Sequence, residues 1–156
     1  MSFLKETIIS LPIVIILAIL SSQLVTVPTE SMSPIINPGD MVLVEKTNIL
    51  DVFDELDPND IKVGDIIVYE KPVQTDNGQS ESNEEIIHRV IAIGNLNGKK
   101  YLILKGDNNI FVDNEKVYLS QVDGRVVMWG RNPILIPKAG YLIFYIKNLF
   151  HLGENR

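Results

Sequence analysis

The sequence predicts a mostly β protein that follows an N-terminal transmembrane helix. An uncharged, strongly apolar run, residues 7–29, stands near the start of the chain. After it come short segments rich in β-branched residues, separated by turn sequences, with no helix-period stretch of useful length between them. We therefore expect an antiparallel, coiled sheet that forms a partly open barrel over residues 30–132.

The run 7–29 includes the sequence LPIVIILAIL. As an α-helix it would be about 35 Å long, close to the roughly 30 Å hydrocarbon core of a bilayer. Pro12 lies inside it, and membrane helices tolerate such a kink. A cleaved signal peptide is the alternative, but only Lys5 and the α-amine supply positive charge before the run, and no clean small-x-small site precedes Ser31. We therefore expect a retained anchor.

Charges on the two sides of the run predict its orientation. Lys5 and the α-amine precede it, whereas acidic residues come first on the other side, before Lys46. Cytoplasmic flanks of membrane helices carry the excess of positive charge. Residues 1–6 are therefore expected in the cytoplasm and the bulk of the chain outside it.

Five short segments have the composition of strands, and turn sequences separate them. The expected strands are residues 41–46, 65–70, 86–93, 101–105 and 125–129. Two polar stretches, 47–60 and 72–85, read as irregular insertions, and the second is expected to be a solvated loop or a hairpin tip.

The C-terminal segment 133–156 is apolar and aromatic, but Lys138 and Lys147 interrupt it. Its longest uncharged piece, 139–146, is too short to span a bilayer. We expect an interfacial element with Tyr141, Phe144 and Tyr145 near the lipid headgroups. A strand or helix of the outer domain is the alternative.

Composition excludes several kinds of partner and cofactor. The formal net charge is -6 and no long basic stretch is present, which argues against nucleic acid. The chain has no cysteine, so disulfides and thiolate chemistry are excluded. Its two histidines form no His-x-x-x-His pair, so we expect no zinc site and no other cofactor.

Asn97-Gly98 is the strongest short hairpin signal in the chain. If these residues form a two-residue turn, His88 lies directly opposite Asp107. Directly opposed Cβ atoms are about 4.5–5.5 Å apart, so the imidazole and the carboxylate would be neighbours. A bulge would change this register.

Ser31 stands just beyond the apolar run, and other residues in the chain could activate it. A serine hydroxyl needs a base to take its proton, and His88 has a suitable intrinsic pKa. Asp107 or Asp113 could hold the imidazole in the useful tautomer. The Ser31 N–H and the Thr29 hydroxyl could stabilise an oxyanion. Each residue alone has an ordinary structural explanation, but together they supply what nucleophilic hydrolysis needs.

The same residues resemble the motifs of type I signal peptidases. In chain order these are Ser31-Met32-Ser33-Pro34, Pro38-Gly39-Asp40, Gly64-Asp65-Ile66-Ile67-Val68-Tyr69, His88-Arg89-Val90, Lys105-Gly106-Asp107-Asn108-Asn109, Asp113 and Gly124-Arg125-Val126. The match runs in order from the apolar run to about Trp129 and therefore covers most of the chain. It is closest to the archaeal and endoplasmic-reticulum branch, which has a histidine where the common bacterial enzymes have a lysine base.

The resemblance implies a role for each matching residue. Ser31 would be the nucleophile, His88 the general base, and Asp113 the acid of the triad, with Asp107 supporting the site. Thr29 matches a hydroxyl position in the oxyanion hole of bacterial relatives. The hairpin argument instead places Asp107 beside His88, so the two arguments disagree on which aspartate orients the base.

The resemblance also implies a reaction and a place for it. A mostly antiparallel β domain with a shallow groove at the membrane would cleave signal-peptide-bearing precursors as they leave the translocation machinery, after small residues at positions −1 and −3. The four residues from Val27 to Ser31 span at most about 14 Å, which keeps the nucleophile near the bilayer. The membrane would be the plasma membrane, or the endoplasmic reticulum in a eukaryote.

Two other interpretations are open. The chain could be a membrane-anchored module or subunit that binds extended peptides without cleaving them, although all residue types of the triad are present. It could also be a cytoplasmic, self-cleaving peptidase of related fold. Such relatives typically use a lysine base, so the apolar run and His88 argue against that class.

Overall fold

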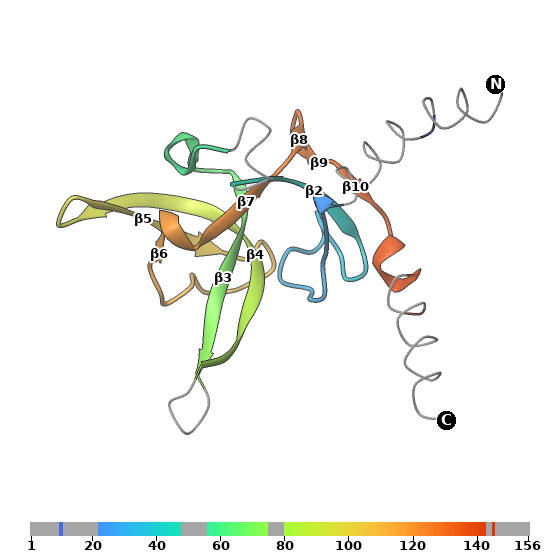
Figure 1. The fold of residues 1–156 in the computed structure, drawn as a ribbon, viewed down its shortest axis with the longest axis horizontal. Helices are drawn as coiled ribbons and strands as arrows, with labels where there is room; N and C mark the ends of the chain where they lie inside the picture. Colours follow the sequence, from blue (N-terminus) through green and yellow to red (C-terminus); the bar gives the residue numbers. More distant parts are fainter. Residues whose placement is uncertain (1–9, 11–21, 48–55, 75–79, 143–144, 146–156) are drawn as a thin grey trace.

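The computed structural model describes residues 10, 22–47, 56–74, 80–142 and 145. They form a mostly β, antiparallel structure, which confirms the predicted class. The main sheet has the strand order β1-β2-β7-β3-β4-β5-β6, with β10 also paired to β2 (Figure 1). Among the described strands no pairing joins β1 to β6, so this sheet stays open. A second, two-stranded sheet pairs β8 with β9.

The described residues form more strands than the five expected. They are β1 (Leu24–Thr26), β2 (Met41–Lys46), β3 (Ile66–Gln74), β4 (Ser80–Leu96), β5 (Lys99–Lys105), β6 (Val117–Tyr118), β7 (Val122–Val126), β8 (Met128–Trp129), β9 (Asn132–Pro133) and β10 (Leu135–Ile136), with 3-10 turns η1 (Pro58–Asp60) and η2 (Leu119–Gln121). Only β2 has the predicted bounds. The expected insertion 72–85 lies largely in the arms of the β3–β4 hairpin, which projects from the body of the domain (Figure 1).

The predicted transmembrane segment 7–29 lies largely outside the described residues, but its end needs correction. Leu24–Thr26 form β1, paired antiparallel with β2, instead of the last turn of a helix. Val25 and Val27 are 7% and 2% exposed, and burying them in the core favours strand over helix here. The β structure therefore begins before residue 30. Within the described part of the chain, no helix has the length and hydrophobicity to cross a membrane.

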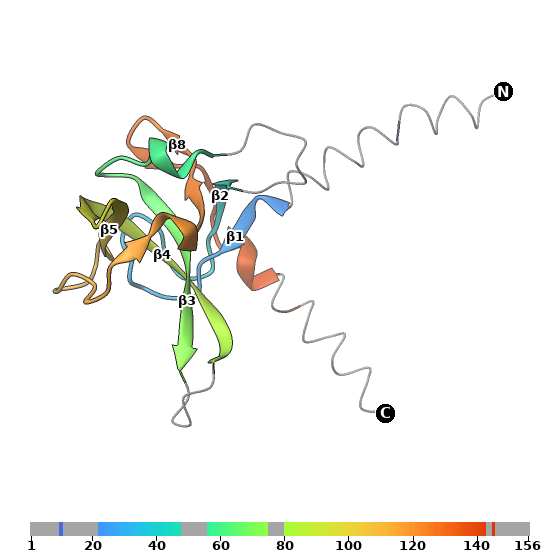
Figure 2. The same ribbon diagram turned by 60° about the vertical axis from the view of Figure 1, so that its left-hand side comes forward.

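The β structure also continues past residue 132, into the segment expected at the membrane interface. In β10, Leu135 is paired with Val42 of β2. Residues 139–142 are helical, and the N–H of Gly140 donates to the carbonyl of Gly39 at 2.9 Å. In Figure 2 this helical turn lies beside β1. Phe144 and Lys147 are outside the described residues, so the interfacial position of the remainder stays a prediction.

Strand β3 is buried on both faces, and each face belongs to a different hydrophobic cluster. Ile66 and Val68 pack into the first cluster, with residues of β1, β2 and the loop between them. Ile67 and Tyr69 pack into the second, with residues of β4 and β5. Because alternate side chains of a strand point to opposite faces, β3 joins the two halves of the core.

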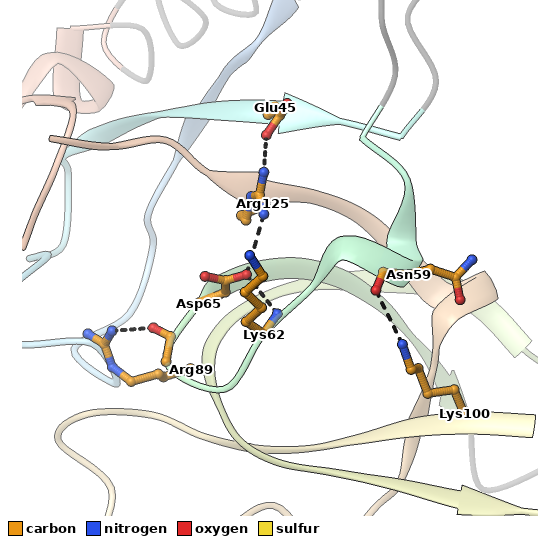
Figure 3. Close-up of polar contacts among 8 residues, drawn as sticks. Glu45, Asn59, Lys62, Asp65, Arg89, Lys100 and Arg125 are labelled. Carbon is orange, nitrogen blue, oxygen red and sulfur yellow. Dashed lines mark hydrogen bonds and ion pairs between the residues drawn. The ribbon is translucent and has the colours of Figure 1, made fainter. Parts of the chain in front are cut away.

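A polar network fixes the start of β3 against two other strands. Arg125 of β7 donates to Glu45 of β2 at 2.7 Å and pairs with Asp65 at 3.5 Å (Figure 3). The N–H of Lys62 also donates to the Asp65 carboxylate, at 2.9 Å. Because the guanidinium binds carboxylates on both sides, it sets the spacing of β2, β7 and β3.

The position of Ile67 leads to a stability prediction. Ile67 is fully buried, so Ile67→Ala should lower the free energy of unfolding by about 2–5 kcal/mol, since it removes apolar contacts and leaves a cavity. Urea denaturation of the full chain measures this. Val63, which is 61% exposed, is the control, and Val63→Ala should change stability by less than about 0.5 kcal/mol. Equal losses in the two variants would contradict the burial of β3.

Candidate active site

Ser31 lies on the loop between β1 and β2, and the core holds that loop from below. The side chains of Met32 and Ile36 are 1% and 0% exposed and belong to the first cluster. At the base of the loop the N–H of Val27 donates to the backbone carbonyl of Asp40 at 2.9 Å, and the N–H of Gly39 donates to the backbone carbonyl of Val27 at 2.8 Å. Ser31 is therefore carried by a closed loop with two buried anchors.

Asp40, from the Pro-Gly-Asp motif, ties this loop to the C-terminal part of the domain. Its buried carboxylate accepts hydrogen bonds from the backbone N–H groups of Asn37, at 2.9 Å, and of Lys138, at 3.0 Å. A buried carboxylate needs such donors to offset its lost hydration. The motif therefore has a structural explanation that sequence reasoning did not give.

Ser31 lines a cavity of about 250 Å³. Thr29 lies on the same wall, with its Oγ1 3.2 Å from the Ser31 Oγ. The β4 segment that ends in His88 also lines this cavity, and apolar side chains including Val27 and Ile87 complete the lining. The structure therefore brings together three of the predicted site residues: Thr29, Ser31 and His88.

The β4–β5 hairpin explains how His88 is placed. Asn97 and Gly98 have φ angles of 52° and 79°, the left-handed conformation that the predicted two-residue turn requires. From Leu96↔Lys99 back to Ala92↔Ile103 the register is the predicted one. A bulge between Val90 and Ala92 then shifts it by one residue. The prediction that His88 lies opposite Asp107 is therefore wrong, because one extra residue enters β4.

The two aspartates have different partners as a result. Asp113 Oδ2 lies 2.6 Å from His88 Nδ1. Asp107 instead accepts two bonds from Arg89, from Nε at 2.8 Å and from Nη2 at 2.6 Å. Arg89 also donates from Nη1 to the carbonyl of Gly64 at 2.8 Å (Figure 3). The hydrogen bonds to Asp107 raise the pKa of Arg89, so the guanidinium stays charged.

Tyr69 of β3 extends the contacts of Asp113, and sequence reasoning missed it. Its hydroxyl donates to Asp113 Oδ2 at 3.4 Å. Burial raises the pKa of Tyr69 and the Asp113 carboxylate raises it further, so the hydroxyl keeps its proton. The sequence did contain a signal for this placement of Tyr69. A two-residue turn at Asn77-Gly78 would place Ile67 opposite His88, the pairing that is observed. Tyr69, two residues after Ile67, then lies on the same face of the sheet as His88.

The turn after β5 contacts the backbone of residues 30 and 31, which the sequence did not indicate. Asn108 donates from its backbone N to the Ser31 carbonyl at 2.8 Å and from Nδ2 to the Glu30 carbonyl at 3.2 Å. A Cβ on Gly106 would lie 2.7 Å from the backbone carbonyl oxygen of Ser31, so only glycine allows this close approach. Among the described residues, no three His, Cys, Asp or Glu side chains cluster as a metal site.

The contrast between two ion pairs leads to a prediction. Asp107→Asn removes the charge that offsets the partly buried Arg89, and should lower the free energy of unfolding by about 1.5–3 kcal/mol. The control is Glu115→Gln, which breaks the exposed ion pair with Lys71 and should cost at most about 1 kcal/mol. Urea denaturation of both variants makes the comparison. A smaller loss for Asp107→Asn than for Glu115→Gln would contradict a structural role for the Arg89 pair.

Comparison with known proteins identifies the family. Residues 1–128 match the family described as signal peptidase, peptidase S26. A protein of Methanocaldococcus jannaschii without an assigned function is 28% identical over 188 residues, covering 88% of this chain and 90% of that protein. The catalytic subunit of the signal peptidase complex of Clavispora lusitaniae is 30% identical over 135 residues, covering 83% of this chain and 69% of that protein. The corresponding subunit of Schizosaccharomyces pombe is 30% identical over 96 residues, covering 56% and 47%. This chain therefore belongs to the signal peptidases of peptidase family S26, and to their archaeal and endoplasmic-reticulum type.

Proposed function

We propose that this chain is a membrane-anchored serine endopeptidase that removes signal peptides from secretory and membrane precursors. Ser31 is the nucleophile, His88 the general base and Asp113 the residue that orients the base. One observation carries the proposal. His88, which is bonded to Asp113 at 2.6 Å, lines the same cavity as Ser31. Family membership supports the reaction class.

The proposed roles follow from the chemistry of the three groups. Asp113 accepts the Nδ1–H of His88, which leaves Nε2 as the ring nitrogen that takes the Ser31 proton. As Oγ loses its proton it attacks the scissile carbonyl carbon, and a tetrahedral oxyanion forms. The imidazolium gives this proton to the leaving amine as the C–N bond breaks, and His88 then takes a proton from a water that hydrolyses the acyl-enzyme and frees Ser31. Tyr69 donates to the same Asp113 oxygen and so helps to fix the carboxylate.

The oxyanion would be bound by donors on the nucleophile's own loop. The candidates are the Ser31 N–H and the Thr29 hydroxyl, whose oxygen is 3.2 Å from Ser31 Oγ. Donors aimed at the position of the developing charge stabilise the transition state more than the substrate. Asp107, paired with Arg89, supports the site from outside the proton-transfer path.

The cavity fits an extended peptide with small side chains. Its two long walls are residues 27–31 and the β4 segment 84–88. In the described structure this part of β4 is paired only with β3, because pairing with β5 starts at Arg89. Unpaired strand edges bind peptides through main-chain hydrogen bonds. The limited, largely apolar space favours small residues at positions −1 and −3 of the precursor.

The proposed location depends on the apolar residues before β1. We propose that they anchor the chain in the plasma membrane, or in the endoplasmic reticulum of a eukaryote, with the N-terminus in the cytoplasm and the β domain outside. Anchoring the enzyme and precursor in one bilayer raises their effective concentration. The proposed partners are the precursor proteins, the lipid bilayer and the protein translocation machinery. The relatives named as catalytic subunits of a complex support an assembly.

The main alternative is a module that binds precursors without cleaving them. The same cavity and strand edges would serve both functions. The contacts of Asp113 favour the enzyme, because peptide binding alone does not need a carboxylate at 2.6 Å from a histidine nitrogen.

Cleavage of a precursor tests the proposal. Purified, detergent-solubilised protein should cleave a signal-peptide-bearing precursor after a small residue. Ser31→Ala and His88→Ala should lower the rate by about 10⁴-fold or more, as loss of a triad member does, and Asp113→Ala should also cause a large loss. Ser33→Ala is the matched control, since Ser33 is on the same loop and bonds to Asn37. Gel mobility and N-terminal sequencing of the product measure the outcome.

The result for Asp107→Ala separates the two aspartates. We expect a smaller loss of activity than for Asp113→Ala when the folded fractions are made equal. Cleavage that survives Ser31→Ala would sink the proposal. Binding of the precursor by the wild-type chain with no cleavage would move the function to the binding module.

Accessibility labelling tests the proposed orientation. The chain has no cysteine, so a single Lys62→Cys, at an exposed position, gives one reactive thiol. On intact cells that hold the protein in the plasma membrane, a membrane-impermeant maleimide should label this variant. Ser2→Cys is the comparison and should react only after permeabilisation. The reverse pattern would contradict the predicted orientation.

A further inference from the structure

We propose that the side chain of Asn108 is a positioning residue that aims the Ser31 N–H at the oxyanion. This inference rests on the proposed function and assigns a part of its oxyanion hole. Asn108 lies on the turn after β5, far from Ser31 in the sequence. It acts through the backbone of residues 30 and 31 and has no contact with the reacting atoms in the proposal.

The argument starts from the geometry of one peptide unit. The Glu30 carbonyl and the Ser31 N–H belong to the same planar group and point in opposite directions. Whatever holds the carbonyl therefore sets the direction of the N–H. Asn108 Nδ2 donates to this carbonyl at 3.2 Å, and the N–H of Ser33 donates to it at 3.0 Å. Two donors from different segments thus fix the plane.

The next peptide unit is fixed by the same residue. The backbone N–H of Asn108 donates to the Ser31 carbonyl at 2.8 Å. Asn108 therefore holds the carbonyls on both sides of Ser31, one through its side chain and one through its backbone. Rotation of either peptide would break a bond. This restricts the φ and ψ angles of the nucleophile, which also set the direction of its side chain.

Asn108 is itself held in place by its neighbours. Asp107, the preceding residue, is bound at both carboxylate oxygens by Arg89. The N–H of Asn109 donates to the Gly106 carbonyl at 3.0 Å, which closes the turn. The Asn108 amide is therefore presented by a rigid turn, as the positioning of a catalytic group requires.

The effect should fall on the transition state. A hydrogen bond to a carbonyl polarises the N–H of the same peptide. A well-aimed N–H stabilises the oxyanion much more than the uncharged carbonyl of the bound substrate. Loss of the Asn108 amide should therefore lower kcat and leave KM nearly unchanged. Loss of one oxyanion donor itself costs about 10²–10³-fold, so loss of its positioning residue should cost about tenfold or more.

The test compares Asn108→Ala and Asn108→Asp with the wild type in the full chain. The first variant removes the side-chain donor, and the second keeps the shape but places a carboxylate against the Glu30 carbonyl. Asn114→Ala is the matched control, because Asn114 is an exposed asparagine of the same loop. Kinetics on a peptide substrate give kcat and KM, and thermal unfolding checks the fold.

Two further measurements separate positioning from a general structural role. A peptide aldehyde forms a hemiacetal with the serine and places its oxygen in the oxyanion hole, so its affinity should fall by the same factor as kcat. The uncleaved peptide should bind Ser31→Ala with and without Asn108→Ala equally well. The pH profile of kcat/KM should keep its shape, because the His88–Asp113 pair is untouched.

The outcomes are distinct from those that test the proposed function. A lower kcat with an unchanged KM and weaker aldehyde binding, in folded variants, supports the inference. Wild-type rates in both Asn108 variants, or equal weakening of peptide and aldehyde binding, overturn it while Ser31-dependent cleavage still stands. If the wild-type chain does not cleave at all, the proposed function fails and the inference fails with it.

Discussion

A single extra residue in β4 controls the arrangement of the candidate site. Val90 and Ile93, which lie on the two sides of the bulge, both pack on the second cluster, although strict alternation would send them to opposite faces. The bulge therefore keeps both ends of a long strand on the core while moving the register with β5 by one residue. Because of this shift, Asp107 pairs with Arg89 and Asp113 pairs with His88. Bulges commonly re-aim side chains in this way.

Both hydrophobic clusters of the core support the site. Met32 and Ile36 hold the loop of Ser31 to the first cluster. Val90, which follows His88 and Arg89 in the sequence, packs in the second cluster. Strand β3 contributes to both clusters, so it fixes their separation. Strand β3 and the two clusters therefore fix the position of Ser31 relative to His88. Rigid elements of this kind suit a site that needs accurate geometry.

Sequence reasoning found the parts of this structure that depend on local chemistry. The turn at Asn97-Gly98 follows from the low cost of positive φ at those residues, and β2 follows from a run rich in β-branched residues that begins after a turn sequence. The bulge had no local mark, because no Gly or Pro stands at Ile91. Asp113 could be preferred to Asp107 only from the family resemblance, since its approach to His88 depends on that bulge. β1 was hidden because an apolar, β-branched segment next to a longer apolar run cannot be divided by periodicity alone.

The correction at β1 also changes the argument about the membrane. If the proposed helix ends before Leu24, residues 7–23 remain, which is near the lower limit of about 17 residues for a span. The nucleophile can then lie up to about 25 Å from the helix end, instead of about 14 Å. Yet β1 is an end strand of the sheet order and leads directly into the wall of the cavity. In the proposed function, a precursor leaving the same bilayer therefore meets the extended edge of β1 beside Ser31. Pairing with this edge holds the precursor in the extended conformation that cleavage requires.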